Sequence, residues 1–208
     1  MESMRSALWR AGVVLCCLAL HSQVIEFESN GLRYKTLTRN SFTVMFAPLT
    51  SHVKEYSIIQ VALSNGSKVS WTVRPEEFRY LHEDGTITPG APALTVVESL
   101  LQHSSRHDVI KLVATYEASI YGNSRLESTN GYEERRRSAL AEVSSARIKA
   151  AAAASAIAFV TTKLAPGQST DGAVFFPNHG HPIGPGHLLL HAAGEDFDLP
   201  CDGEPGGK

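Results

Sequence analysis

The sequence changes its periodicity twice along the chain, and this limits the fold more than any other feature. Residues 24–90 contain short alternating runs separated by turn residues, and in the clearest run Ile59, Val61 and Leu63 share one face. Residues 93–158 instead carry apolar residues at helical spacing. Strand-like runs then return at 159–162, 173–176, 187–190 and 195–199. The order predicts a mainly β, α+β protein with a helical insertion.

The insertion is predicted to contain two or three helices. Thr95 and Glu98 form a capping-box pattern just before an apolar pair. Residues 109–120 carry an apolar stripe at helical spacing. Asn130 can cap a further helix that runs through an alanine-rich stretch to Ile157, and such small residues allow close approach of a neighbouring helix or sheet.

Both β regions are expected to belong to one domain. Neither region alone has enough strands to cover its apolar face, so we expect a single antiparallel β-sandwich over residues 23–200, with helices inserted at about 93–158. The last residues are polar and rich in glycine. We expect a disordered tail at 201–208, with the change of character already beginning at Pro200.

The turn at Asn65-Gly66-Ser67 leaves two topologies open. If it closes a hairpin, a three-residue turn places Val61 opposite Trp71 and keeps the apolar side chains of both strands on one face. The same segment is also compatible with an arch that carries the chain from one sheet to another.

The first residues resemble an export signal. Arg5 and Arg10 precede an apolar run of about ten residues, which ends before polar residues and the small Ser22. The run is too short to span a membrane, so residues 1–22 are predicted to be a signal peptide that is cleaved near Ser22 and leaves no membrane span. The protein is therefore expected in the periplasm or outside the cell.

The cysteines agree with this interpretation. Cys16 and Cys17 lie within the signal and fit a bacterial lipobox poorly, so no lipid anchor is expected there. Cleavage would leave only Cys201, which excludes an internal disulfide. An exported domain without disulfides is more typical of a bacterial envelope than of a small animal secreted module.

The charge of the chain does not favour a polyanionic partner. The 19 basic residues and 21 acidic residues give a net charge of −2, which is no reason to expect nucleic acid or an anionic membrane as a ligand. The basic run at 135–137 follows two glutamates at the start of a predicted helix, where a solvated face explains it.

Four histidines near the end of the chain are the candidate metal ligands. Imidazole binds zinc, copper and nickel, and a loop bearing His179 and His181 would have to meet His187 and His191 on the following strand. No additional carboxylate ligand is evident among them. A flexible loop with exposed histidines is the competing interpretation, and we commit to no metal and no cofactor.

Catalytic patterns are missing from the sequence. Ser169 is not in a nucleophile elbow, because an extra residue precedes Gly172. There is also no phosphate loop, dinucleotide fingerprint or His-Glu-x-x-His motif. Cys201 lies in the predicted tail and is a poor nucleophile candidate. We name no catalytic residues.

Two segments resemble a known family. The run from Leu164 through Pro166-Gly167 and Gly172 to Phe176-Pro177, and the earlier Leu63-Ser-Asn65-x-Ser67, are similar to segments of secreted bacterial immunoglobulin-like domains of unknown function. The resemblance implies an extracytoplasmic, non-catalytic immunoglobulin-like sandwich. It brings no site residues with it.

Three functions follow as hypotheses. The first is a non-enzymatic envelope module that binds another envelope protein or a surface polymer through the sandwich edge or the helical insertion. The second is a periplasmic metal-binding protein that uses the loop between His179 and His191. The third is a hydrolase. The sequence does not indicate an oligomeric state.

Overall fold

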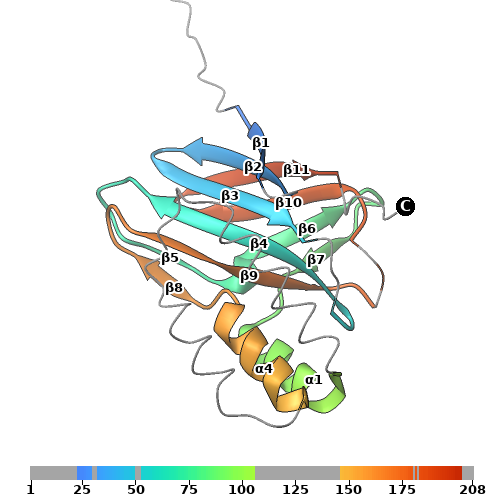
Figure 1. Ribbon diagram of the computed structural model, residues 1–208. Coiled ribbons are helices and arrows are strands. Elements are labelled where there is room, and N and C mark those ends of the chain that lie inside the picture. Colours follow the sequence, from blue (N-terminus) through green and yellow to red (C-terminus); the bar gives the residue numbers. More distant parts are fainter. Residues whose placement is uncertain are drawn as a thin grey trace, which may run out of the picture.

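The computed structural model places three antiparallel sheets and two α-helices within the residues it describes (Figure 1). This confirms the expected mainly β protein with helices. The described residues are 23–29, 32–49, 53–105, 146–179, 181 and 183–202.

The largest sheet has five strands, in the order β1-β2-β3-β4-β9. Strand β4, which lies between β3 and β9, is buried on both faces, because Ile59 and Val61 face one layer while Ile58 and Ala62 face another. Alternation predicted only the first of these two buried faces. The strands are β1 (Ile25–Ser29), β2 (Leu32–Arg39), β3 (Phe42–Pro48), β4 (Tyr56–Asn65) and β9 (Ser169–Pro177).

The second sheet has four strands, in the order β11-β10-β6-β7. The turn between β6 and β7 is the predicted one: Gly85 has a φ of +85°, and Asp84 Oδ1 accepts a hydrogen bond from the Thr86 amide at 2.9 Å. A short 3₁₀ turn, Pro75–Glu77, precedes β6. The strands are β6 (Phe78–His82), β7 (Ile87–Pro89), β10 (Gly186–Ala192) and β11 (Glu195–Cys201).

These two sheets pack face to face. Phe46 and Phe176 from the first sheet share one buried cluster with Tyr80, Leu188 and Leu199 from the second. Rings meet edge-on or tilted across this core, as Phe42 does with Phe197 at 6.0 Å between centroids. This shared core supports the expectation of a sandwich to which the β regions before and after the helices both contribute strands.

The connection after Asn65 is an arch. The following strand, β5 (Trp71–Val73), does not return along β4 but pairs with β8 (Thr162–Leu164) in a separate two-stranded sheet. The hairpin register that placed Val61 opposite Trp71 is therefore wrong, since Val61 lies between Phe46 and Gly172. Pairing with β3 and β9 already occupies both edges of β4, which leaves no edge for β5.

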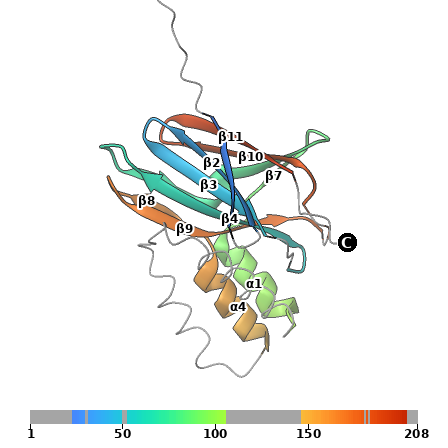
Figure 2. The ribbon, with the colours of Figure 1, turned by 45° about the horizontal axis from the view of Figure 1, so that its top comes forward.

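Two helices cover the other face of the five-stranded sheet (Figure 2). They are α1 (Ala93–His103) and α4 (Ala146–Ile157), which follow β7 and precede β8 in the chain. Ala150, Ala153 and Ala154 are buried in one cluster with Val96 and Leu100 of α1, as small residues permit. The part of the chain that the structure describes thus stacks the helices, the five-stranded sheet and the four-stranded sheet as three layers.

Two sequence-based boundaries in this region need correction. Helix α1 begins at Ala93, and Pro92 occupies the N-cap position, so Thr95 lies inside the first turn rather than capping it. The strand expected at 159–162 begins only at Thr162, because Phe159 is drawn into the core and its amide donates to the Ala173 carbonyl at 2.8 Å. Gly172 permits this approach, since a Cβ there would lie 2.8 Å from the Cα of Phe159.

The sequence-based prediction placed the start of the C-terminal tail too early in the chain. Strand β11 includes Pro200 and Cys201, and Cys201 is only 3% exposed because its side chain points into the sandwich core. Asp202 is held by an ion pair with Lys35. Residues 203–208 lie outside the described part of the chain.

Several predictions also concern residues outside the described ranges. They are the signal peptide at 1–22 with Cys16 and Cys17, the stripe at 109–120, the cap at Asn130 and the basic run at 135–137. Neither α1 nor α4 has the length and hydrophobicity needed to cross a bilayer, and these are the described α-helices.

Candidate functional site

The four candidate metal ligands do not meet in one place. His187 and His191 both project to solvent from β10, four residues apart along an extended strand, which separates them by roughly 13 Å. Each pairs with its own carboxylate on β11. His187 Nδ1 lies 2.6 Å from Asp198 Oδ1, and His191 Nδ1 lies 2.7 Å from Asp196 Oδ1.

The other two histidines, His179 and His181, are exposed in the connection between β9 and β10. Among the described residues, which include all four histidines, no group of three or more histidine, cysteine, aspartate or glutamate side chains is placed to hold a metal ion. The geometry at this hairpin is that of two solvent-exposed His–Asp pairs.

His187 also borders an open groove at one end of the four-stranded sheet. The groove has a volume of about 670 Å³. The Tyr80 hydroxyl of β6 donates to the Gly184 carbonyl at 2.5 Å and so joins β6 to the segment that precedes β10. Its lining combines polar and apolar groups without a common chemical character. It is lined by Leu81, His82, Glu83, Gly85, Pro185, Gly186, His187, Pro200, Cys201 and Asp202.

A more distinctive feature is the edge strand β1 of the five-stranded sheet. The side chains of residues 25–28 are all exposed, although the strand is fully paired with β2 along one edge. Ile25 is 61% exposed and Phe27 is 38% exposed, and both point to the helix-bearing face, as does Tyr34 opposite Phe27. Among the described strands, only β2 pairs with β1. An edge strand with large exposed apolar side chains is a surface on which another strand can add.

The apolar side of β1 rests on a rigid support. The ring of Phe27 stacks on the ring of Tyr34, with 5.2 Å between centroids and 10° between planes. Tyr34 is only 1% exposed, and its hydroxyl donates to Gln60 Oε1 of β4 at 3.4 Å. Burial raises the pKa of Tyr34 to about 12. Phe27 therefore stacks against a buried ring on the neighbouring strand, while its own side chain stays 38% exposed at the edge of the sheet.

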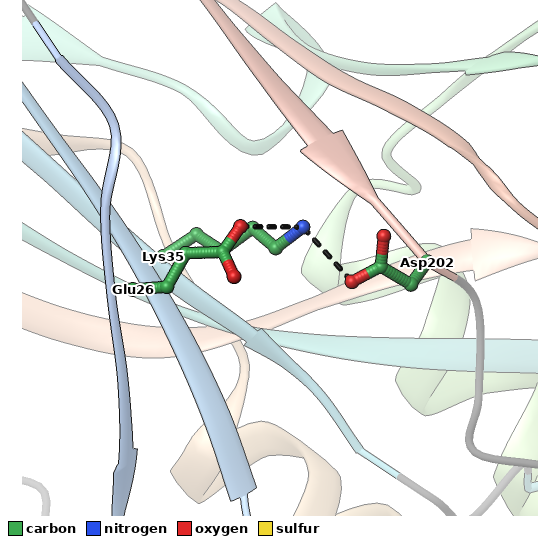
Figure 3. Close-up of polar contacts among 3 residues, drawn as sticks. All are labelled: Glu26, Lys35 and Asp202. Atoms are coloured by element: carbon green, nitrogen blue, oxygen red, sulfur yellow. Dashed lines mark hydrogen bonds and ion pairs between the residues drawn. The ribbon is translucent and has the colours of Figure 1, made fainter.

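The opposite side of β1 is fastened by an ion-pair clip that we define as Glu26, Lys35 and Asp202 (Figure 3). Lys35 Nζ lies 3.0 Å from Glu26 Oε1 and 3.0 Å from Asp202 Oδ2. The lysine side chain is 6% exposed, whereas the two carboxylates are 59% and 65% exposed. The clip connects β1 and β2 of one sheet to the end of β11 in the other.

The electrostatics of the clip favour the charged lysine. Desolvation alone would lower the pKa of Lys35, but hydrogen bonds and charge attraction from Asp202 and Glu26 outweigh it and leave the pKa raised. Two more contacts join the end of β2 to β11: Arg39 donates to the Asp196 carbonyl, and Asn40, just after β2, donates to Glu195. The β1–β2 edge of the five-stranded sheet is thus fastened to β11 of the four-stranded sheet.

Sequence reasoning identified a short strand here but did not single out its exposure or the clip. The alternation of Ile25, Glu26, Phe27 and Glu28 was the available signal, because apolar and acidic residues alternate on the two faces. No local pattern connects Lys35 with Asp202, since the two are 167 positions apart.

The raised pKa of Tyr34 predicts alkaline sensitivity at this support. Below pH 10 the phenol is protonated in both folded and unfolded chains, whereas between pH 10 and 12 only the unfolded chain loses the proton. The free energy of unfolding of the wild type should therefore fall more steeply over this interval than that of Tyr34→Phe, by a total of about 2 kcal/mol. Urea denaturation at several pH values measures both slopes, and equal slopes would contradict the buried, protonated phenol.

Comparison of the chain with protein-family models, with curated proteins and with solved structures found no significant match.

Proposed function

We propose that this protein is a non-enzymatic, extracytoplasmic module of the cell envelope, with an immunoglobulin-like sandwich that binds another envelope protein through strand β1. The observation that carries the proposal is the exposed edge: Ile25 and Phe27 project from a strand that the described sheet leaves unpaired on its outer side. Strand addition at such an edge uses main-chain hydrogen bonds for affinity and alternate side chains for selectivity.

The start of the folded domain is compatible with export. Val24 packs against the sandwich core, and β1 begins at Ile25, so cleavage near Ser22 would remove no residue of the described sheet. Under this proposal β1 lies close to the start of the mature chain. A partner strand can then approach its outer edge in the periplasm or outside the cell.

The experiment is photo-crosslinking in the cells that naturally express the protein. The full chain carries a photoreactive phenylalanine analogue in place of Phe27, and a matched control carries it in place of Ile87, which is 52% exposed on β7. We expect a discrete crosslinked protein from position 27, recovered with the envelope after fractionation, and much less of it from position 87.

Two results would overturn the proposal. One is the absence of any adduct specific to position 27, and the other is recovery of the chain from the cytoplasm. An adduct to carbohydrate rather than protein would replace the protein partner with a surface polymer.

A further inference from the structure

The two faces of β1 carry opposite chemistry. Ile25 and Phe27 point to the helix-bearing face, whereas Glu26 points toward the four-stranded sheet, where Lys35 reaches it. Glu28 shares the side of Glu26, because side chains alternate along a strand. A strand added along the outer edge would therefore meet apolar groups on one face and carboxylates on the other.

A second copy of the same strand fits this edge poorly. If two β1 strands pair antiparallel with their apolar sides together, Glu26 of one copy lies opposite Glu28 or Glu26 of the other. A slip by one residue separates the like charges but places each apolar side chain beside a glutamate. Charge and register thus act against self-pairing through β1.

We infer that the edge of β1 accepts an extended strand in which apolar residues alternate with lysine or arginine. The inference rests on the proposed function and specifies its partner. The apolar residues of the added strand lie beside Ile25 and Phe27, and its cations lie beside Glu26 and Glu28. Both complementary contacts form in the same register, which neither an acidic strand nor a uniformly apolar strand can achieve.

The chain's own cations do not remove this preference. Arg33 and Lys35 lie opposite Glu28 and Glu26 on β2, so they are one strand further from the docked chain than the glutamates. Two strand spacings amount to roughly 10 Å, about one Debye length at ordinary ionic strength, whereas directly opposed side chains are roughly 5 Å apart. Glu26 is also engaged in the clip, which makes Glu28 the cleaner determinant of charge selectivity.

The first test measures peptide binding to the whole protein by fluorescence anisotropy. The probe is a short blocked peptide in which valine and lysine alternate. One comparison peptide replaces lysine by glutamate, and another has the valine-lysine composition in blocks. We expect the alternating basic peptide to bind at least about five-fold more tightly than either comparison peptide. N-methylation of alternate backbone amides along one edge of the probe should abolish binding, because strand addition needs those donors.

The second test reverses the charge selectivity. Glu28→Lys combined with Arg33→Glu keeps an opposite-charge pair between β1 and β2 while reversing the charge at the edge. We expect this variant to prefer the valine-glutamate peptide, with a change of about five-fold or more in the affinity ratio. Ile87→Ser on β7 is the matched control and should leave both affinities unchanged. Retention of the wild-type selectivity in the double variant would overturn the inference.

These outcomes separate the two proposals. A protein crosslinked at position 27, together with no preference for the basic alternating peptide, would refute the partner chemistry and leave the proposed function standing. Absence of a crosslinked partner in the native envelope, together with tight binding of the basic peptide, would refute the proposed envelope function and leave the edge chemistry standing.

Discussion

Removing both carboxylates of the clip, with Glu26→Gln and Asp202→Asn in one chain, should lower the free energy of unfolding by about 3 kcal/mol. The lysine ammonium would then remain in a site where its side chain is 6% exposed, without an opposite charge to compensate for lost hydration. Lys35→Met should change the free energy of unfolding by less than about 1 kcal/mol, because the alkyl stem is largely retained and both carboxylates can be hydrated at the surface. Urea denaturation followed by circular dichroism measures both values at neutral pH.

The single substitutions show whether the clip acts as a unit. Either carboxylate alone lies 3.0 Å from the lysine nitrogen, so each single variant should lose clearly less than half of the stability lost by the double variant. Glu28→Gln, on the same strand but outside the clip, is the matched control and should be nearly neutral. If Lys35→Met lowered the free energy of unfolding as much as the double variant, the loss in the double variant would not come from leaving the lysine charge unpaired.

The alternation of apolar and polar residues predicted most strands, because successive side chains of a strand point to opposite faces of its sheet. The turn at Asp84-Gly85 and the run before Asn65 both combine a local side-chain pattern with a local turn preference, and both lie where they were expected. The second buried face of β4 was not predicted, because it depends on the helices α1 and α4 that pack there from a distant part of the sequence.

The boundaries that failed were decided by tertiary contacts. Phe159 and its neighbour have strand-forming character, yet the core takes the phenylalanine ring, which lies edge-on to Phe78 at 5.4 Å. Cys201 follows a proline and precedes a glycine-rich end, but its side chain completes the sandwich interior. Local propensity is a weak guide wherever a side chain fills a space that the rest of the fold has created.

The candidate site was the hardest part to predict. The histidines were candidates because imidazole binds several metals. The extended geometry of β10 separates His187 from His191, and each lies beside an aspartate of β11. The β1 edge is a short run of common residues. It stands out as a binding surface because Ile25 and Phe27 remain exposed on a strand that the described sheet pairs along one edge. The alternation of apolar and acidic residues in this run was visible in the sequence, but the exposure of its apolar side chains depends on the whole fold.

Asn65→Asp should lower the free energy of unfolding by about 3 kcal/mol, although the side chain keeps its size. The asparagine is 0% exposed, and its Nδ2 donates to the carbonyls of Val69 at 2.8 Å and Leu164 at 3.0 Å. An aspartate has no amide protons for these acceptors and places a carboxyl oxygen against two carbonyl oxygens in a buried site. Thermal and urea denaturation of the two proteins measure the loss.

The size of this effect follows from what Asn65 joins. Its Oδ1 accepts from the amide and hydroxyl of Ser67, which shapes the arch, while its Nδ2 reaches Leu164 at the end of β8. Ser67→Ala removes this hydroxyl contact and the acceptor of the Trp71 indole N–H, both at a part-exposed site, but leaves the two carbonyl contacts of Asn65 in place, so it should cost only about 1 kcal/mol. The segment around Asn65 and the segment that begins at Leu164 thus meet at a single side chain. A loss in Asn65→Asp no greater than in Ser67→Ala would mean that backbone pairing alone holds the arch against β8, and that Asn65 only fills space between them.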